Sequence, residues 1–331
     1  MTEKRLNVLE ICAGAGGQAL GLEAAGFTHA GAVEIDRTAC ATLRQNRPRW
    51  NVLEGDVRDV SGRDFRGVDL LAGGVPCPPF SLAGRQLGQE DERDLFPEAL
   101  RLISEARPAA VMLENVRGFS TARFADYRAQ IMAFLVKLGY SPEWQVLNAS
   151  DYGVPQLRPR FVLVALRGRQ IGRFSWPRLA PCTSTVGEEV GDLMGSRRWP
   201  GAQQWAARAS AIAPTIVGGS TRHGGPDLGP TRAKREWRRL GVDGMGIADE
   251  PPGSGEPVEG YLPRLTVRMV ARLQGFPDSW ALSGAKTAAY RQVANAFPPP
   301  VAAAVGAEIG RALRRERTAD RPPLQLELAA V

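Results

Sequence analysis

The chain has 331 residues, of which 44% are hydrophobic and 23% are charged. These are ordinary globular values, so they exclude wholesale disorder, and the length allows one large or two small domains. The 42 Lys and Arg outnumber the 35 Asp and Glu, and the resulting +7 favours an anionic partner without identifying it. No apolar run reaches the ~20 residues that cross a bilayer, and no signal peptide precedes the first strand pattern, so we expect a soluble, cytoplasmic protein.

The few cysteines and histidines exclude some kinds of chemistry. The four cysteines lie far apart and form no C-x-x-C pair, so we expect neither a disulfide framework nor a structural zinc site. The only histidines are His29 and His223, too few for histidine-based metal chemistry. We therefore expect no metal cofactor.

The first ~170 residues alternate between strand and helix patterns. Strands are predicted at 6–12, 29–36, 50–57, 68–76 and 109–116, with a closing pair at 141–149 and 160–167. Helices are predicted from the turn at 13–17 through Leu22, around 39–46, at 95–106 and at 124–138. Repeated strand–helix units with continuous apolar strands predict an α/β fold with a doubly wound, mainly parallel sheet.

The pattern changes near Trp176. From there to about Leu262 the chain is rich in Gly, Pro and Arg and has weak periodicity, which predicts a small irregular domain because the segment is too long for a simple loop. Helices return at 265–276 and 300–316, and the second is expected to pack on the first domain. The predicted organisation is a first domain at 1–175, a small irregular domain at 176–262, helices at 263–317 that complete the first domain, and a flexible tail at 318–331.

A glycine-rich turn follows the first predicted strand and opens a helix. Gly14-x-Gly16-x-x-Ala19 and the later Glu34 satisfy the dinucleotide fingerprint, in which glycines allow close backbone approach and the acid binds ribose hydroxyls. The alternative is a tight turn without a ligand. Asp56, at the end of the third predicted strand, is suited to an adenine amino group. Acids after two neighbouring strands favour an adenosine ligand without phosphates.

A cysteine and several charged residues fall at other predicted strand ends. Cys77 stands between prolines after the fourth strand, and Glu114 is near the end of the fifth. Arg158 and Arg160 share one face at period two. Each has an ordinary alternative, since a lone cysteine is commonly a small buried hydrophobe and the charges could be solvated. Together, and in this order, they indicate a site with a thiol nucleophile.

These residues belong to a pattern that resembles the bacterial DNA cytosine-C5 methyltransferases. The resemblance is carried, in the family's order, by EICAGAGGQALGLEAAGF (10–27), VEID (33–36), GGVPCPPFS (73–81), ENVRGF (114–119), LNASDYGVPQLRPRF (147–161), RLTVRMVARLQGFPDSW (264–280) and RQVANAFPPPV (291–301). Pro78 replaces the family's Gln, Cys12 its Phe and Ala294 its Gly. No catalytic side chain is lost, although Cys12 and Phe297 are expected to reshape the cofactor pocket.

The resemblance implies methyl transfer from S-adenosylmethionine to C5 of a cytosine in a specific duplex sequence, leaving S-adenosylhomocysteine. Cys77 would add to C6 and make C5 nucleophilic, and the base must be flipped out of the duplex to be reached. Glu114, protonated or sharing a proton, would contact N3 and the amino group, and Arg158 would contact O2. Arg158 and Arg160 would supply the cationic charge that activates the thiol.

By the same resemblance, the glycine turn and the strand ends would bind the cofactor, with Pro76 beside the transferred methyl group. The implied contacts are Cys12, Ala13, Gly14, Gly16, Gly17, Glu34, Ile35, Asp56, Val57, Gly74, Pro76, Leu95, Asn295 and Phe297.

The middle segment is predicted to recognise the DNA. From Arg197 to Arg239 there are nine basic residues and two acids, and the difference, 9 − 2 = 7, equals the net charge of the whole chain. A charged run is usually a solvated face, but Arg, Gly and Thr are interleaved in 211–225, which suits loops that approach a groove. Thr215-Ile216 matches the family's Thr followed by a branched apolar residue. The predicted DNA contacts are Ser81, Gln86, Gln156, Thr215, Ile216, Arg222, Lys234 and Arg235.

Three other functions remain open on the sequence alone. Transfer-RNA cytosine methyltransferases share the catalytic blocks, but the basic middle segment favours duplex DNA. A nicotinamide-dependent oxidoreductase would explain only the glycine fingerprint, and a non-enzymatic DNA-binding relative would not need the complete set of Cys77, Glu114 and the arginines. We therefore predict a monomeric DNA (cytosine-5-)-methyltransferase that acts on double-stranded DNA, in restriction–modification or a related phage defence.

Overall fold

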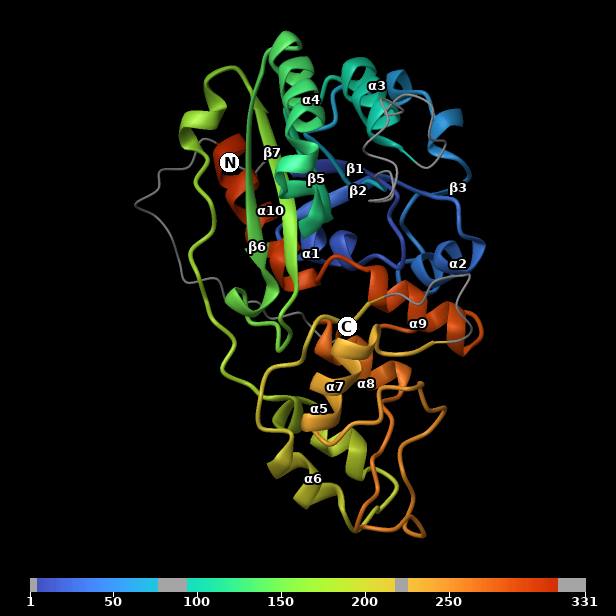
Figure 1. The fold of residues 1–331 in the computed structure, drawn as a ribbon. Coiled ribbons are helices and arrows are strands. Elements are labelled where there is room, and N and C mark those ends of the chain that lie inside the picture. The colour runs from blue at the N-terminus through green and yellow to red at the C-terminus, as the bar shows by residue number, and fades with distance from the viewer. Residues whose placement is uncertain (1–4, 77–93, 218–225, 315–331) are drawn as a thin grey trace. The chain divides into compact units, whose positions relative to one another are not determined.

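A computed structural model of the chain describes residues 5–76, 94–217 and 226–314 (Figure 1). Its contacts divide the chain into two units. Unit 1 takes Met1–Leu147, Pro159–Arg178 and Val301–Glu327, and unit 2 takes Asn148–Arg158 and Leu179–Pro300. Each unit is described by itself below.

Unit 1 is built on a seven-stranded sheet of order β3-β2-β1-β4-β5-β7-β6. The first five strands pair in parallel, and β7 pairs with β5 in the antiparallel direction. The strands are β1 (Leu6–Ile11), β2 (Phe27–Glu34), β3 (Val52–Glu54), β4 (Leu70–Gly74), β5 (Ala110–Val116), β6 (Tyr140–Asn148) and β7 (Pro159–Arg167). The chain order reverses between β1 and β4, and sheets of this type bind ligands at the carboxyl ends of the strands at such a point.

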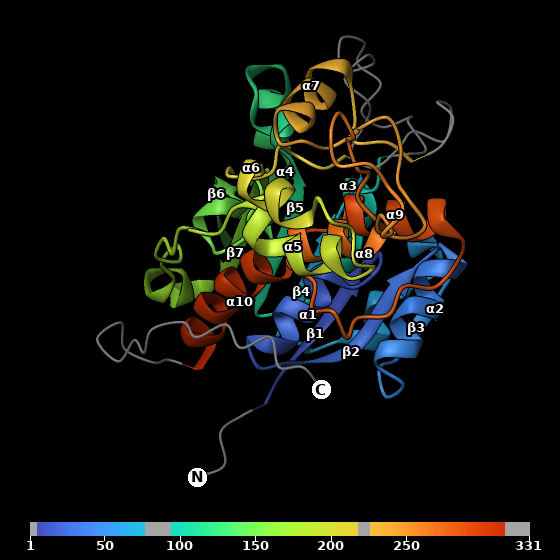
Figure 2. The same cartoon turned by 90° about the horizontal axis from the view of Figure 1, so that it is seen from below.

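Helices cover both faces of the sheet. Because side chains alternate along a strand, Leu9 of β1 faces the core that contains α3 and α4, while Leu6 faces α10. Figure 2 shows α10 beside α1, where a Cβ added at Gly306 would come 2.9 Å from Leu22 Cδ2. The helices of unit 1 are α1 (Gly17–Ala24), α2 (Arg37–Asn46), α3 (Phe96–Ala106), α4 (Ala125–Lys137) and α10 (Pro299–Arg314). The predicted α/β fold with a doubly wound, mainly parallel sheet is confirmed.

Local sequence explains where two of these helices begin. Asp36 caps α2, since its carboxylate accepts hydrogen bonds from the backbone N–H groups of Thr38 and Ala39. Pro97 stands in the first turn of α3, where its missing N–H costs nothing. Helix α2 therefore starts directly after the end of β2, which carries Glu34, and α3 starts directly after Leu95, another candidate site residue.

Unit 2 is mainly helical in its described part. Its helices are α5 (Val186–Gly195), α6 (Ala202–Arg208), α7 (Thr231–Arg239), α8 (Val267–Leu273) and α9 (Lys286–Asn295). Helices α5 and α6 approach closely, because a Cβ at Gly187 would lie 1.9 Å from the carbonyl oxygen of Ala206. Buried Trp237, Trp280 and Tyr290 form part of its interior. The extended pairing described in this unit consists of isolated bridges such as Gln156↔Ala213.

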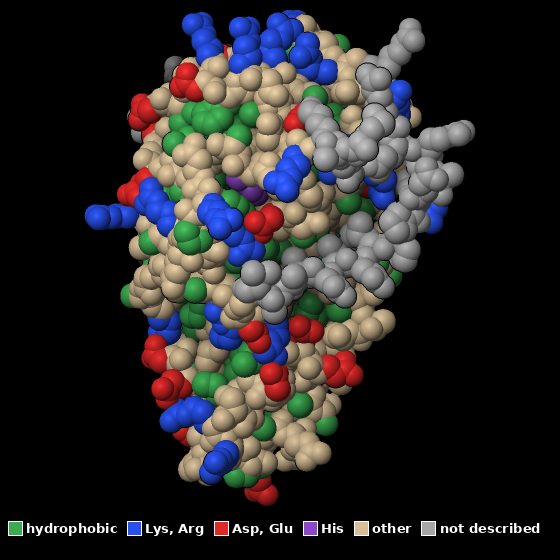
Figure 3. Space-filling model, turned by 180° about the vertical axis from the view of Figure 1, so that it is seen from behind, with side chains coloured by type: hydrophobic (Ala, Val, Ile, Leu, Met, Phe, Trp, Pro, Cys, Tyr) green, Lys and Arg blue, Asp and Glu red, His purple; other side chains and the backbone are tan. Residues whose placement is uncertain are grey.

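The surface charges do not by themselves locate a binding surface. Figure 3 shows basic and acidic side chains interspersed over the face seen from behind, with a row of basic groups at the upper edge of the view.

Across the described ranges, none of the helices is long and apolar enough to cross a membrane.

Candidate active site

The turn between β1 and α1 has an unusual backbone. Cys12, Gly14 and Gly16 all have positive φ, at 52°, 55° and 84°. Glycine adopts this region freely, but a residue with a Cβ pays roughly 1–2 kcal/mol. The N–H of Ala13 donates to the carbonyl of Val33 at 3.0 Å, so the turn is fixed to the end of β2.

Glu34, the last residue of β2, holds the turn through its side chain. Its Oε2 accepts a hydrogen bond from the N–H of Gly14 at 2.7 Å, and its Oε1 accepts one from the N–H of Asp36 at 2.7 Å. Each carboxylate oxygen can accept a second hydrogen bond. The neighbouring Ile35 is 67% exposed, so its side chain offers an open apolar surface beside the carboxylate.

Asp56 begins a short 3-10 helix, Val57–Asp59. Its carboxylate accepts the N–H of Arg58 at 2.9 Å and pairs with the Arg58 guanidinium, also at 2.9 Å. The backbone hydrogen bond, helped by the guanidinium, holds the pKa of Asp56 below its ordinary value. Asp56 is therefore an ionised acceptor at neutral pH.

The ends of β4 and β5 are tied together beside a second carboxylate. Gly74 pairs with Glu114, and a Cβ at Gly74 would lie 3.2 Å from Glu114 Oε2. The side-chain amide of Asn115 donates to the carbonyl of Val75 at 2.8 Å. The N–H of Leu95 donates to the carbonyl of Pro76 at 3.2 Å. This hydrogen bond connects the described residues before position 77 with those after position 93. These contacts fix the strand end that leads into Cys77.

Glu114 also forms an ion pair with Arg160 of β7. The distance from Arg160 Nε to Glu114 Oε1 is 2.9 Å, and the side chains are 11% and 9% exposed. Burial lowers the pKa of Arg160, an effect that the charge of Glu114 opposes. The structure therefore brings together two predicted catalytic residues in unit 1.

Arg158 lies in unit 2 and is fully buried. Its Nη1 donates to the carbonyl of Ile216 at 2.5 Å, and its Nη2 donates to the carbonyls of Ala294 and Ala296 at 2.6 and 3.0 Å. Its guanidinium thus joins two segments that are distant in sequence. Asn295, between those two alanines, is exposed, and Phe297 is buried.

Gln156 and Leu157 hold the segment that contains Thr215 and Ile216. The buried side chain of Gln156 accepts the N–H of Ile216 at 3.0 Å, and its amide donates to Gln274 Oε1 at 2.6 Å. The hydroxyl of Thr215 donates to the carbonyl of Leu157 at 2.5 Å. Ile216 itself is fully buried. Three predicted DNA contacts, Gln156, Thr215 and Ile216, therefore lie together.

The other predicted DNA contacts have different surroundings. Lys234 of α7 pairs with Asp227 at 2.6 Å, whereas Arg235 is exposed. The remaining predicted site residues, Cys77, Ser81, Gln86 and Arg222, lie outside the described residues.

Two polar residues of this part of the fold were not singled out from the sequence. Asn115 ties β5 to β4, and its place directly after Glu114 is a signal that could have been used. Tyr290 lies with its hydroxyl 2.8 Å from the carbonyl of Val217 and 2.6 Å from that of Asp227. No local pattern around Tyr290 indicates this contact.

The three cysteines within the described ranges have unreactive surroundings. Burial, with the nearby Glu34, Asp56 and Glu10, raises the pKa of Cys12 to about 12. Burial likewise raises the pKa of Cys40 to about 11 and increases that of Cys182. All three are therefore thiols, and not thiolates, at neutral pH.

We expect alkylation to distinguish Cys77 from these three. At neutral pH, iodoacetamide should modify Cys77 first, because only a thiolate reacts quickly and the other thiols are held protonated. Peptide mass spectrometry over a time course measures the order. Modification of Cys12 or Cys40 before Cys77 would contradict the assignment of Cys77 as the activated thiol.

The sheet order, the glycine turn and the acids at strand ends define a Rossmann-like fold of the methyltransferase class. The fold is shared with solved structures of low sequence identity. The Entamoeba histolytica methyltransferase EhMeth has a TM-score of 0.65 at 16% identity, covering 94% of this chain and 98% of that one. A mutant of Spodoptera frugiperda DNMT2 has a TM-score of 0.62 at 18% identity, covering 93% of this chain and 99% of that one.

The family model of C-5 cytosine-specific DNA methylases matches residues 6–311, so the chain belongs to that family. It is a DNA (cytosine-5-)-methyltransferase, as predicted. The Type II methyltransferase M.NaeI of Lentzea aerocolonigenes is 58% identical over 315 residues, 94% of this chain and 76% of that protein. M.NgoMIV of Neisseria gonorrhoeae is 54% identical over 312 residues, 93% of this chain and 98% of that protein.

Proposed function

We propose that the chain transfers a methyl group from S-adenosylmethionine to C5 of a flipped-out cytosine in a specific duplex sequence, through a covalent Cys77–C6 adduct. The observation that carries this proposal is the buried Glu114–Arg160 pair beside the strand end that leads into Cys77. Since its similar relatives bear the name Type II methyltransferase, we assign the chain to restriction–modification.

The residues around the glycine turn fit the adenosine part of such a donor. Glu34 has acceptor capacity for ribose hydroxyls, Ile35 offers an apolar surface to a purine, and Asp56 is an ionised acceptor for the adenine amino group. When bound, the cofactor would supply the methyl group. The residues proposed to hold it are those predicted from the sequence, with Gly74, Pro76 and Leu95 at the end nearer Cys77.

The two arginines are assigned different roles. Arg160 has its Nε on Glu114 and its Nη1 on the carbonyl of Pro159, so it shares the immediate surroundings of the catalytic carboxylate. Arg158 has both Nη atoms on backbone carbonyls of unit 2. We therefore assign the contact with cytosine O2, expected of Arg158 from the sequence, to Arg160. Arg158 is assigned the task of holding the Thr215–Ile216 segment.

For the addition step, the thiolate of Cys77 forms a bond to C6 and the ring electrons move toward C5 and N3. Glu114, protonated or sharing a proton, donates to N3 and so neutralises the charge that develops there. C5 then forms a bond to the methyl group as the bond from that group to sulfur breaks, which leaves S-adenosylhomocysteine. Loss of the C5 proton, return of the N3 proton to Glu114 and expulsion of the Cys77 thiolate from C6 restore the ring. Arg160 orients Glu114 and stabilises the negative charge on O2.

Unit 2 is proposed to recognise the target sequence. Helix α7 is amphipathic, with Trp237 buried and Arg232, Arg235 and Arg238 exposed. In the part of the chain that the structure describes, no ion pair involves these three arginines. Exposed arginines that are not held in ion pairs suit phosphate contacts, which position a protein on DNA without reading its sequence. Lys234, on the same helix, differs from them because its ammonium pairs with Asp227.

We expect Arg235→Ala to weaken DNA binding equally for all sequences and to reduce the slope of log affinity against log salt by about one. Lys234→Ala should reduce the slope less, because its ammonium is paired with Asp227, and it should lower the melting temperature instead. Fluorescence anisotropy at several salt concentrations measures both slopes. An Arg235→Ala variant with an unchanged slope would remove α7 from the DNA interface.

Incubation with tritiated S-adenosylmethionine tests the proposed function. Duplex DNA should become labelled and transfer RNA should not, whereas the reverse would favour the alternative substrate. Bisulfite sequencing of a host that expresses the protein should then find C5-methylation at one recurring short sequence. Methylation without any sequence preference would refute recognition of a specific target.

A further inference from the structure

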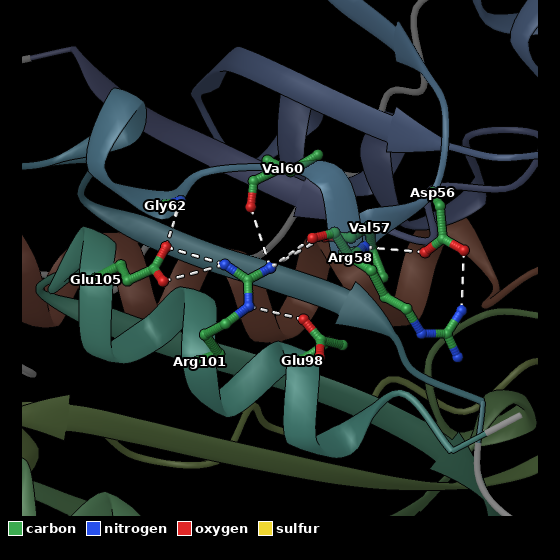
Figure 4. Close-up of polar contacts among 8 residues, drawn as sticks. All are labelled: Asp56, Val57, Arg58, Val60, Gly62, Glu98, Arg101 and Glu105. Carbon is green, nitrogen blue, oxygen red and sulfur yellow. Dashed lines mark hydrogen bonds and ion pairs between the residues drawn. The ribbon is translucent and has the colours of Figure 1, made fainter. Parts of the chain in front are cut away.

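Arg101, in the middle of α3, hydrogen-bonds two carboxylates and three backbone carbonyls (Figure 4). Its Nε donates to Glu98 at 2.7 Å, and its Nη1 donates to both oxygens of Glu105 at 3.1 and 3.0 Å. These two acids lie one turn before and one turn after it on the same helix face. The guanidinium plane is therefore held in one orientation.

The remaining nitrogen of Arg101 points away from its own helix and toward the turn that follows Asp56. Its Nη2 lies within hydrogen-bond distance of the carbonyls of Val57, Arg58 and Val60, at 3.3, 3.4 and 3.0 Å. The turn is thus wrapped around one NH₂ group. All three carbonyls belong to residues within four positions of Asp56.

Glu105 fixes the far end of the same turn. Its Oε2 accepts the N–H of Gly62 at 2.8 Å. A Cβ at Gly62 would lie 2.8 Å from both Glu105 Cβ and the carbonyl oxygen of Leu102, so the turn is in close contact with α3. The turn is therefore bound at its centre by Arg101 and at its end by the carboxylate that orients Arg101.

We propose that Arg101 is a positioning residue for the adenine end of the cofactor site, because it fixes the turn that carries Asp56 and Val57. The inference rests on the proposed function, in which these two residues contact the adenine. Asp56 accepts from Arg58, and the carbonyl of Arg58 is in turn bound by Arg101. The chain of contacts therefore runs from α3 to the carboxylate that would select an amino group.

The same helix begins at another proposed cofactor contact. Leu95 is the residue that precedes α3. Arg101 therefore connects, through one rigid helix, two places where the cofactor would be bound. Lysine cannot replace it, since a single ammonium lacks the planar fork that reaches two carboxylates and the carbonyls at once.

The test is the preference for adenine over hypoxanthine in Arg101→Lys. Calorimetry would give the dissociation constants of S-adenosylhomocysteine and S-inosylhomocysteine, which lacks the amino group, for wild type and variant. We expect Arg101→Lys to weaken the binding of S-adenosylhomocysteine roughly tenfold, which corresponds to about the loss of one good hydrogen bond. The binding of S-inosylhomocysteine should weaken less. The preference should shrink. The KM for the methyl donor should rise while kcat stays within about twofold.

Arg47→Lys is the matched control. Arg47 also donates from its Nε to one carboxylate, that of Glu23, at 3.0 and 2.8 Å, and also binds a carbonyl, that of Asn46. It is 25% exposed against 33% for Arg101, and the carboxylate and the carbonyl that it binds, those of Glu23 and Asn46, lie outside residues 56–62. This variant should keep the wild-type preference. If Arg101→Lys does not fold, Glu98→Gln, which loosens one side of the guanidinium, should reduce the preference in the same direction.

The outcomes separate the inference from the proposed function. Equal weakening of both ligands by Arg101→Lys, or an unchanged preference, would overturn the positioning role. If wild type prefers adenine, and Asp56→Ala removes that preference while Arg101→Lys does not, only the inference fails. If wild type binds neither ligand, the proposed cofactor site is wrong, and the inference that rests on it is wrong as well.

Discussion

Cys77→Ser is expected to abolish methyl transfer while folding and DNA binding persist. The hydroxyl is close in size to the thiol, but its far higher pKa leaves almost no ionised nucleophile to add to C6. Loss of a covalent nucleophile lowers a rate on the order of 10⁴-fold or more. The three cysteines in the described ranges cannot substitute for it, because burial raises the pKa of each.

The measurement is single-turnover methylation of duplex DNA with tritiated donor, with circular dichroism and DNA-binding assays alongside. Cys182→Ser is the matched control, since its sulfur lies in unit 2 near the carbonyl of Ser184 and has no proposed part in the reaction. DNA that contains 5-fluorocytosine should trap wild-type protein covalently, because loss of the C5 proton is blocked, and should not trap Cys77→Ser. Robust turnover by the serine variant would refute the covalent mechanism.

The sheet could be predicted because its signals are local. Continuous apolar strands, a glycine turn and helix patterns lie within short windows, and the mainly parallel sheet that they predict is the one observed. The third strand was predicted at 50–57 but ends at Glu54. Asp56 caps the short helix that follows, so a strong local capping bond ends the extended segment earlier than apolar pattern indicates.

The candidate site is only partly visible in the sequence, since some of its residues act through partners far along the chain. Glu34, Asp56 and Glu114 stand at strand ends, which topology brings to one edge of the sheet. Arg101 binds carbonyls more than forty positions away in the sequence, and no local sequence pattern predicts that contact. The side chain of Gln156 binds Gln274, 118 positions later.

The burial of a charged side chain is a second property that could not be predicted from the sequence. Arginine is rarely buried completely, so Arg158 and Arg160 read as equivalent groups free to contact a substrate. The structure separates them: carbonyls of unit 2 surround the guanidinium of Arg158, while Arg160 pairs with Glu114 in unit 1. Which arginine acts on the base thus depends on tertiary contacts.

The ion pair of Glu114 and Arg160 makes Glu114→Gln the second large expected effect. An amide keeps the shape and can hydrogen-bond the base, but it cannot pass a proton to N3 as the thiolate adds to C6. Loss of proton transfer of this kind costs roughly 10²–10⁴ in rate. The change also leaves the charge of the mostly buried Arg160 without its partner, which should lower stability by about 3 kcal/mol.

Three measurements distinguish these two consequences. The single-turnover rate should fall, the dissociation constant for S-adenosylhomocysteine should stay within about twofold since Glu114 serves the base, and the melting temperature should drop. Glu23→Gln is the matched control, because it breaks the ion pair with Arg47 at the surface of the same unit and should change none of the three by much. Arg160→Lys should keep much of the stability, since it retains a charge beside Glu114, but it should still slow transfer because the fork that orients the carboxylate is lost. A Glu114→Gln variant that transfers methyl groups at the normal rate would show that another group protonates N3. A variant that no longer binds the cofactor would show that Glu114 serves the cofactor and not the base.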